Sequence, residues 1–429
     1  MTRILVTGAG GFLASHLIPA LSHAGYDVIC CGRDTASLQI RFPGCQVAEC
    51  NFASCRGDDL WDGLLRDVSV VINAAGIIQQ HGANTFEAVH RDGPIMLFHA
   101  AERAGVRRVI QISALGADTQ AATLYHRTKW AADEELRGST VEWVVLQPSL
   151  IYGCGGRSQA FFAALAAMPV LCLVGGGDQR IQPIHVEDVV EGILRLIHAD
   201  APSHLTLPVV GPEPITFRHF MEAIRRWLGL GIAPILTVPV GLVRLAARMG
   251  DVVRSDFVNS DTLVMLCRGN TADPAPYVAA TGVRPRPLSL GLPERGAPRS
   301  ELLSASLYFA PPVLRLSIAL VWIGSGIVSL WWFPRETSEA WLLRTGIPAA
   351  WTALTLQITA ILDILLGIAT LIRWHLPAVL FLQLLLICGF TLILTVRMPE
   401  VWIHPFGPAL KNLPLFVATW VLWVMERRR

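Results

Sequence analysis

The first 21 residues constrain the fold of this chain most strongly, because they combine a short strand, a glycine turn and the start of a helix. Residues 3–6 read Arg-Ile-Leu-Val and predict a buried strand. Residues 7–14 follow at once with Thr-Gly-Ala-Gly-Gly-Phe-Leu-Ala, and leucine recurs at helical spacing at positions 13, 17 and 21. A strand, a glycine turn and a helix in this order form a cradle for a dinucleotide pyrophosphate.

The glycine spacing in this turn is Gly8-x-x-Gly11-x-x-Ala14 rather than Gly-x-Gly-x-x-Gly. Gly8 permits the tight turn, and Gly11 lets the backbone approach a pyrophosphate at the helix N-terminus. Ala14 takes the third position, where its single methyl group still allows close packing of helix on strand. The residues of the cradle expected to contact a nucleotide are Thr7, Gly8, Gly10, Gly11, Phe12 and Leu13.

Apolar strand patterns and helical patterns alternate through the first half of the chain. Such alternation is typical of a doubly wound parallel α/β sheet, which binds ligands at the carboxyl ends of its strands. From residue 157 to 290 glycines and prolines break the pattern, as expected of a small substrate subdomain. The strands predicted after the first cover residues 26–31, 45–48, 68–73, 107–113 and 142–148.

The second predicted strand ends in Gly32-Arg33-Asp34, and this end bears on cofactor choice. NAD enzymes place an acidic residue there to bind the ribose 2′-hydroxyl, whereas an arginine accommodates a 2′-phosphate. Arg33 favours NADP(H) over NAD(H). Asp34 is a carboxylate close to the same place and argues in the opposite direction.

Residues 125–129 read Tyr-His-Arg-Thr-Lys, so Tyr125 and Lys129 lie four residues apart and share one face of a predicted helix. A neighbouring ammonium favours phenolate and lowers the pKa of a tyrosine, which suits Tyr125 to acid/base catalysis. Lys129 is also expected to hydrogen-bond the nicotinamide ribose, and Ser113 at the end of the fifth strand to hold a substrate carbonyl. Of 35 basic residues only Lys129 and Lys411 are lysine, so Lys129 stands where arginine would not serve.

The composition argues against several other classes of function. A net charge of +2 gives no electrostatic footprint for nucleic acid. The nine cysteines contain no C-x-x-C pair, so neither a metal site nor a redox couple is expected, and reduced thiols in a cytosolic domain are the expected state. The segment Val238–Met249 carries apolar residues with Arg244 and Arg248, and it either packs normally, caps a substrate site or lies on a bilayer.

The last third of the chain is strongly apolar and predicts a four-helix transmembrane domain over residues 309–429, after a linker at 291–308. The alternative is a buried helical bundle in a soluble protein. Positive residues lie in excess on the side of both termini, which predicts a cytoplasmic N-terminal domain in a bacterial inner membrane. Asp363 near the middle of the second span marks either a functional site or a protonated structural acid. The predicted spans are Val313–Phe333, Trp351–Ile372, Leu376–Val396 and Pro408–Met425.

Residues 1–290 resemble the atypical short-chain dehydrogenase/reductases, a group that includes the nucleotide-binding accessory subunit of respiratory complex I. The resemblance rests on the glycine spacing, the Tyr125/Lys129 pair, the run 112–117 (Ile-Ser-Ala-Leu-Gly-Ala), the run 148–153 and the run 182–189. It implies a Rossmann-type fold and a structural rather than catalytic role for His185. It also implies cofactor contacts, near adenine from Asn51 and Phe52, after the fourth strand from Ala74, Ala75 and Gly76, and near nicotinamide from Pro148 and Ile151.

Residues 309–425 resemble the DoxX-like membrane family, notably at residues 404–414. Together the two resemblances imply a membrane-tethered NAD(P)(H)-dependent oxidoreductase with a small-molecule, lipid-like or quinone-related substrate. Two alternatives stay open: a non-catalytic nucleotide-binding scaffold of a membrane redox complex, and a nucleotide-sugar-type epimerase or dehydratase.

Overall fold

A computed structural model describes residues 2–54, 59–252, 258–292, 296–403, 407 and 409–427 of the chain. The chain divides into two compact units, Met1–Ser306 and Leu307–Arg429. Three of the positive residues near the termini of the predicted membrane domain lie outside the described ranges, namely Arg295, Arg428 and Arg429. The same is true of Cys55, one of the nine cysteines, and of His404, Pro405, Phe406 and Pro408 in the DoxX-like run.

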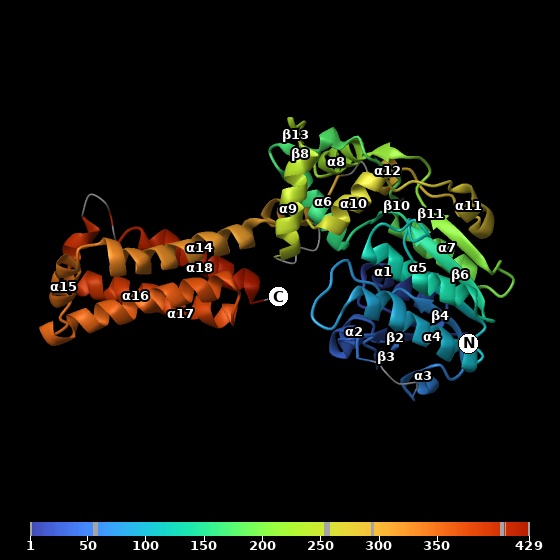
Figure 1. Ribbon diagram of the computed structural model, residues 1–429, viewed down its shortest axis with the longest axis horizontal. Coiled ribbons are helices and arrows are strands. Elements are labelled where there is room, and N and C mark those ends of the chain that lie inside the picture. Colours follow the sequence, from blue (N-terminus) through green and yellow to red (C-terminus); the bar gives the residue numbers. More distant parts are fainter. Residues whose placement is uncertain are drawn as a thin grey trace. The chain divides into compact units, whose positions relative to one another are not determined.

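Seven parallel strands form the central sheet of the first unit, in the order β11-β6-β5-β4-β1-β2-β3 (Figure 1). The strand order reverses between β1 and β4, and in such sheets this crevice is where ligands bind. The doubly wound parallel sheet predicted from the sequence is confirmed, and the six predicted strands agree with the structure to within one residue at each end. The strands are β1 (Arg3–Thr7), β2 (Asp27–Gly32), β3 (Gln46–Glu49), β4 (Val68–Asn73), β5 (Arg108–Ile112), β6 (Glu142–Pro148) and β11 (Leu205–Val209).

Helices cover both faces of this sheet, because successive strand residues point to opposite sides. In β1, Ile4 and Val6 pack under α1 (Phe12–His23) and α7 (Val186–Ile197). Leu5 packs on the other face in a second apolar core, to which α4 (Gly93–Arg103) and α5 (Leu124–Arg137) contribute. All three strand residues are fully buried. Each such side chain contributes about 1.5–3 kcal/mol relative to exposure.

A third apolar core lies in the subdomain that follows the main sheet. It is built on α6 (Arg157–Ala167), α8 (Phe217–Trp227) and the parallel pair β8 (Leu171–Val174) and β13 (Ile235–Val238). The remaining elements of the first unit are α2 (Thr35–Arg41), α3 (Asp59–Leu64), a π-helix η1 (Glu87–Asp92), β7 (Ile151–Tyr152), η2 (Gly175–Gly177), β9 (Arg180–Ile181), β10 (Ile184–His185), β12 (Ile215–Thr216), α9 (Val240–Val252), α10 (Ser260–Arg268), α11 (Ala275–Thr281), α12 (Leu288–Gly291) and α13 (Arg299–Leu307).

The segment predicted as a linker, residues 291–308, contains helix α13 and contributes to a core. Leu292 and Ala305 are both buried in the third apolar core. The compact N-terminal unit accordingly extends to Ser306 rather than to residue 290. Sequence pattern alone reads this segment as a linker because it begins with prolines, glycine and arginines.

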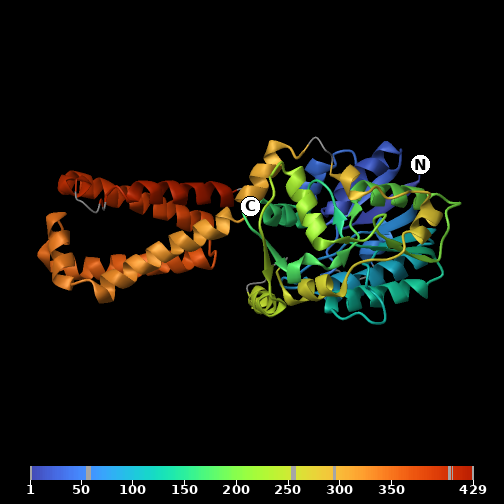
Figure 2. The ribbon, with the colours of Figure 1, turned by 90° about the horizontal axis from the view of Figure 1, so that it is seen from above.

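The second unit is a bundle of apolar helices that run side by side (Figures 1 and 2). Within the described part of the chain, three helical segments are long and apolar enough to cross a membrane: Arg299–Trp332, Ala349–Leu371 and Leu376–Arg397. The fourth apolar helix, Asn412–Glu426, is shorter than a usual span. The helices of the unit are α14 (Ala310–Ile327), η3 (Val328–Trp332), α15 (Arg335–Arg344), α16 (Ala349–Leu371), α17 (Leu376–Arg397), η4 (Pro399–Trp402) and α18 (Asn412–Glu426).

Two glycines allow α14 and α16 to pack closely, as small residues do between membrane helices. A Cβ on Gly326 would lie 2.4 Å from the Ala360 carbonyl oxygen, and one on Gly367 would lie 2.5 Å from the Ile323 side chain. The buried Gln383 donates to the Thr370 hydroxyl at 2.9 Å. Thr370 lies two helical turns beyond Asp363 on α16, and the Asp363 carboxyl group faces Ser325 of α14.

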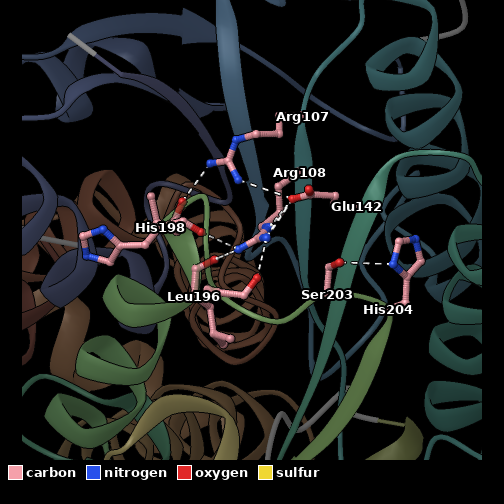
Figure 3. A network of polar contacts seen from close by, with 9 residues as sticks. Arg107, Arg108, Glu142, Leu196, His198, Ser203 and His204 are labelled. Atoms are coloured by element: carbon pink, nitrogen blue, oxygen red, sulfur yellow. Dashed lines mark hydrogen bonds and ion pairs between the residues drawn. The ribbon is translucent and has the colours of Figure 1, made fainter.

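At the amino ends of β5 and β6, a buried arginine joins the sheet to the end of α7 (Figure 3). Arg108 is 1% exposed and forms an ion pair of 2.7 Å with Glu142. Its guanidinium also donates to the carbonyl oxygens of Leu196, His198 and Ala201. With the Nε–H donated to Glu142, all five N–H groups are used, so the charge is buried without an unsatisfied donor. This cluster fixes the C-terminus of α7 against the sheet.

Candidate functional site

The turn between β1 and α1 has the backbone geometry that the glycine spacing predicts. Gly8 has φ +67°, and a Cβ there would lie 2.6 Å from the Ala74 carbonyl oxygen, so only glycine fits. Gly11 is the N-cap of α1, where it has no side chain to bond the first N–H groups of the helix. The space beside Gly10 is open, with no atom within 4 Å of its Cβ position. An open glycine turn before uncapped N–H groups fits a dinucleotide pyrophosphate.

A chain of buried polar side chains runs beneath this turn across three neighbouring strands. Thr7 donates its hydroxyl to Asn73 Oδ1 at 2.5 Å, and Asn73 Nδ2 donates to Gln111 Oε1 at 2.7 Å. Gln111 in turn lies beside the carboxyl group of Asp133 on helix α5. The sequence predicted Thr7 as a cofactor contact, but its hydroxyl proton is used inside this chain. The chain links the nucleotide turn to the helix that carries the Tyr125/Lys129 pair.

Helix α5 presents Tyr125, Lys129 and Asp133 at four-residue intervals on one face. The helix begins at the N-cap Thr123, whose hydroxyl oxygen accepts from the His126 N–H at 3.3 Å. Lys129 Nζ donates to the Ile112 carbonyl oxygen at 3.0 Å and lies 5.7 Å from the centre of the Tyr125 ring. The Tyr125/Lys129 pair is therefore formed at the carboxyl end of β5.

Gly76, in the loop that follows β4, lies next to Lys129. Strand β4 is on the far side of the crevice from β2. The Gly76 Cβ position is 3.7 Å from Lys129 Nζ and 3.7 Å from His90 Nε2. Gly76 is exposed, while Ala74 and Ala75 are partly buried. The lysine thus borders the crevice at the point where the strand order reverses, which is where a nucleotide would lie.

Ser113, which is expected to hold a substrate carbonyl, is hydrogen-bonded within the protein. Its hydroxyl is buried and donates to Asp133 Oδ2 at 2.5 Å. A hydroxyl has one proton to donate, so in this arrangement that proton is not available to a substrate carbonyl. The sequence pattern did not include Asp133, which lies within the run Asp-Glu-Glu at 133–135 and reads as part of a solvated helix face.

Burial dominates the titration behaviour of these groups. It raises the pKa of Tyr125 to about 12, which is opposite to the lowered phenol pKa expected from the neighbouring lysine. Burial lowers the pKa of Lys129 to about 8, an effect that the Asp133 carboxylate opposes. Burial raises the pKa of Asp133 to about 6, and the Ser113 hydrogen bond and the Lys129 charge oppose that rise. The cost of burying phenolate therefore exceeds the help from an ammonium that is bonded to Ile112.

Two histidines flank the Tyr125 ring, and neither was singled out from the twelve histidines of the sequence. The His90 ring lies 5.0 Å from that of Tyr125 and nearly perpendicular to it, and its Nε2 accepts from the Ile77 N–H at 3.0 Å. Burial and the Lys129 charge hold the pKa of His90 well below its usual value. Burial and the Arg268 guanidinium lower the pKa of His126 to about 4. Both imidazoles are neutral at pH 7, so Lys129 is the cation of this cluster.

Arg33 and Asp34, which follow β2, point to different nucleotides in the sequence, and the structure gives them different surroundings. Asp34 Oδ1 accepts from the Ser37 N–H at 3.0 Å and caps helix α2. Arg33 is exposed to solvent. Because the Asp34 carboxylate serves as a helix cap, its place at the end of β2 does not imply binding of a ribose hydroxyl.

The pair Asn51 and Phe52 is turned toward the protein. Asn51 Oδ1 accepts from the Ala53 N–H at 3.2 Å. Phe52 is 7% exposed and packs against Trp61, while the Cβ position of Gly93 is 2.4 Å from it. Phe52 is thus mainly a core residue.

The other residues predicted to contact the cofactor differ in their surroundings. Leu13 is buried in the core under α1, and the Phe12 ring lies 3.3 Å from the Cβ position of Gly156. The Pro148 carbonyl oxygen accepts from the Leu115 N–H at 2.9 Å, and Ile151 belongs to the short strand β7. His185 Nδ1 accepts from the Glu187 N–H and caps α7, in keeping with the structural role expected for it.

A cavity of about 390 Å³ opens beside the Tyr125 cluster. Phe86, which lines it, lies 5.8 Å from the Tyr125 ring in an edge-to-face contact. The remaining lining is mostly polar: Gln79, Gln80, Thr85, Asp251, Asn259 and Asp261, together with Ile78 and Gly82. Among the described residues no group of three or more His, Cys, Asp or Glu side chains is arranged to hold a metal ion.

Comparison with known families assigns the two parts of the chain. Residues 4–207 match the NAD dependent epimerase/dehydratase family, and residues 319–420 match the DoxX-like family. These matches agree with the cradle at β1–α1 and with the bundle of apolar helices.

Two curated proteins are similar to the first half of the chain. Subunit 9 of the NADH dehydrogenase [ubiquinone] 1 alpha subcomplex of Arabidopsis thaliana is 28% identical over 236 residues, which are 52% of this chain and 58% of the plant protein. Ceramide reductase of Caulobacter vibrioides is 26% identical over 227 residues, which are 53% of this chain and 70% of that enzyme. The chain therefore spans less than two thirds of the length of the respiratory subunit that it matches.

Solved structures share the fold of the first unit. The UDP-glucuronic acid 4-epimerase of Bacillus cereus, solved with UDP-glucuronic acid and NAD, has a TM-score of 0.53 at 17% identity and covers 72% of this chain and 100% of its own. The dTDP-glucose 4,6-dehydratase DesIV of Streptomyces venezuelae, solved with NAD, has a TM-score of 0.53 at 20% identity, over 69% of this chain and 95% of its own. The chain is thus similar to the NAD dependent epimerase/dehydratase family over residues 4–207 and to the DoxX-like family over residues 319–420.

Proposed function

We propose that this protein is a membrane-anchored, NADP(H)-dependent oxidoreductase that interconverts a carbonyl and a hydroxyl group on a lipid-like substrate. The observation that carries the proposal is the placement of Tyr125 and Lys129 against the end of β4. A nicotinamide nucleotide, when bound, supplies or accepts the hydride. The protein must then supply a proton donor and a positive charge at the substrate oxygen, and this pair has both.

In this mechanism Tyr125 gives its phenolic proton to the substrate oxygen during reduction and takes it back during oxidation. Lys129 offsets the cost of the phenolate that forms, because its pKa of about 8 leaves it mostly charged at pH 7. Neutral His90 and His126 hold the ring between them without adding a competing charge. Ser113 would serve as the carbonyl clamp only by exchanging its bond to Asp133 for one to the substrate.

The substrate class is proposed from two features. The cavity beside Phe86 has a polar lining, which suits a headgroup with hydroxyl or amide groups. One relative of the first unit is a ceramide reductase, and the apolar helices of the second unit would keep the protein at a membrane. The preference for NADP(H) is proposed from the exposed Arg33 beside an Asp34 that is used as a helix cap.

The distribution of positive residues supports an inner-membrane protein of a bacterium with the first unit in the cytoplasm. Cytosolic nucleotide would then reach the crevice directly.

A second candidate function is a nucleotide-binding subunit without turnover that stabilises a membrane redox complex. It is favoured by the similarity to respiratory NADH dehydrogenase subunits over half of the chain. The Tyr125/Lys129 pair argues for the first function, since a scaffold needs only the cradle.

The Tyr125→Phe variant tests the proposed reaction in detergent-solubilised full-length protein. Removing the phenolic proton is expected to lower turnover of long-chain keto lipids about 10²–10⁴-fold. NADPH binding, followed by nucleotide fluorescence, is expected to remain, because the ring keeps its contacts with His90 and Phe86. Undiminished turnover in this variant would overturn the assignment, and binding without turnover in the unmodified protein would favour the scaffold.

A further inference from the structure

Helix α9 of the first unit turns its large apolar side chains toward solvent. Leu242 is 59% exposed, Leu245 57% and Met249 65%. Positions i, i+3 and i+7 lie within a narrow strip of a helix, since each residue advances by roughly 100°. Ala247 and Gly250 are the buried residues of α9 between positions 240 and 251, and the helix contacts α10. The apolar strip therefore faces away from the core.

Two arginines lie beside this strip. Arg244 and Arg248 are four residues apart and both exposed, so they form a second stripe along the same helix. By the same rotation the arginine stripe is roughly 110° from the centre of the apolar strip, on the side away from Gly250. Seen around its axis, α9 has one side for packing, one apolar strip and one basic flank.

An apolar strip with a basic flank is what an amphipathic helix presents when it lies in a bilayer interface. Apolar side chains reach the boundary between headgroups and acyl chains, and arginines extend sideways to lipid phosphates. Isolated exposed apolar residues are common on protein surfaces, but three in one strip on a helix whose packing side is formed by small residues are not. The segment leading into α9 adds Ile232 and Leu236, which are also exposed.

We propose that α9 binds the surface of the membrane that holds the protein's own C-terminal helices. The occupant is a bilayer rather than a second protein for two reasons on the same chain. The apolar segments Arg299–Trp332, Ala349–Leu371 and Leu376–Arg397 tether the first unit to a membrane, which raises the local concentration of lipid at any surface that can bind it. The arginine flank complements the anionic headgroups of a cytoplasmic leaflet.

This contact goes beyond the proposed reaction, because lipid binding by α9 requires no turnover. It has a consequence for the substrate that does rest on the proposed function. Asp251, in the last turn of α9, lines the cavity beside Phe86, which contacts the Tyr125 ring. By the same rotation Asp251 lies roughly 150° from the apolar strip. Binding of α9 to the interface would therefore hold this cavity one helix diameter, ~10 Å, above the lipid surface, within reach of the headgroup of an amphiphile.

The test uses full-length protein in lipid nanodiscs with the photoreactive residue p-benzoylphenylalanine in place of Leu245. A matched control carries the same residue at Ile40, which is 83% exposed on α2 of the same unit. After illumination, lipid adducts are counted by mass spectrometry. We expect about fivefold more adduct at position 245 than at position 40, because only the former is within reach of acyl chains. The proposal would be overturned by equal yields of lipid adduct at the two positions, or by cross-links from position 245 to protein and none to lipid.

The arginine flank is tested in the same preparation by comparing phosphatidylcholine with phosphatidylcholine containing one quarter phosphatidylglycerol. Anionic lipid is expected to raise the yield at position 245, and the double variant Arg244→Gln/Arg248→Gln is expected to lose that increase. An undiminished increase in the double variant would overturn the role of the two arginines. Thermal unfolding monitored by circular dichroism controls for folding, which exposed substitutions should leave unchanged.

The outcomes separate the two proposals. Lipid adducts at position 245 in a protein that turns over no keto lipid would overturn the proposed function and support the membrane contact. Turnover of keto lipids without such adducts would support the proposed function and overturn the membrane contact of α9.

Discussion

The two ends of the central sheet bury charge in different ways. At the amino ends of β5 and β6, Arg108 donates all five of its N–H groups to Glu142 and to three carbonyl oxygens (Figure 3). At the carboxyl ends, Lys129 and Asp133 are buried as well. Burial lowers the pKa of Lys129 and raises that of Asp133, so it favours the neutral form of both side chains. A buried charge whose hydrogen-bond groups all have partners stabilises the structure, whereas a buried charge that lacks some of these partners is available for proton transfer. The following predictions test this contrast.

The largest effect on stability is expected from Arg108→Ala. The substitution removes the guanidinium donor from the carbonyl oxygens of Leu196, His198 and Ala201. It also removes one of the two arginines that pair with Glu142. Breaking such a buried pair destabilises a protein by about 3–5 kcal/mol. Urea unfolding of the first unit within the full chain measures this loss. A change below about 1 kcal/mol would show that the Arg108 cluster is not structural.

Lys129→Met is expected to have the opposite profile. Methionine fills a similar volume without a buried charge, so the free energy of unfolding should stay within about 1 kcal/mol of the original value. Turnover at saturating nucleotide should fall about 10²-fold or more, because phenolate formation at Tyr125 loses its nearby cation. Parallel urea unfolding and steady-state assays measure both quantities. A loss of stability as large as that of Arg108→Ala would erase the distinction between the two ends.

Asp133→Asn sharpens the comparison through pH. Burial raises the folded-state pKa of Asp133 from 3.8 to about 6, so its contribution to stability is fully present below pH 4 and is lost as pH rises through 6. Relative to the variant, the unmodified protein should lose on the order of 2–3 kcal/mol of unfolding free energy over this interval. Unfolding measured at several pH values between 3.5 and 7 checks this. If the unfolding free energies of the two proteins depend on pH in the same way, burial does not raise the pKa of Asp133.

The smallest effect is expected from Arg33→Ala, which lies outside both buried clusters. Loss of a contact with a 2′-phosphate should weaken NADPH binding about tenfold and leave NADH binding unchanged. Fluorescence titration of each nucleotide measures the ratio. An unchanged ratio would remove Arg33 from cofactor selection and leave the preference unexplained.

The strands of the sheet could be predicted because each is an apolar run followed by a polar or small residue, and the glycine turn at Gly8 because only glycine fits against Ala74. Strand β11 was not predicted, since it contains Pro208. At the edge of the sheet β11 pairs only with β6, which is where a proline is tolerated. Local pattern identifies a strand poorly when its sequence is shaped by its position at an edge.

The Tyr125/Lys129 pair could also be predicted, because both residues lie on one helix at a fixed spacing. Its surroundings could not. Asp133 binds Ser113, 20 residues earlier in the chain, and His90 reaches Tyr125 from the π-helical turn η1. These contacts arise when β4, β5 and α5 assemble, and nothing local in the sequence marks an aspartate or a histidine for burial. The raised pKa of Tyr125 has the same origin, since it depends on burial rather than on neighbours in the chain.

The most direct test of the account is transfer of the label from 4-deuterated NADPH to long-chain keto lipids by full-length protein in nanodiscs. The account predicts deuterium on the carbinol carbon of the product with the unmodified protein. It predicts none above background with Tyr125→Phe, although both proteins bind the nucleotide. Equal transfer by both, or nucleotide binding without transfer to any keto lipid, would contradict the claim that the carboxyl-end cluster is a catalytic centre.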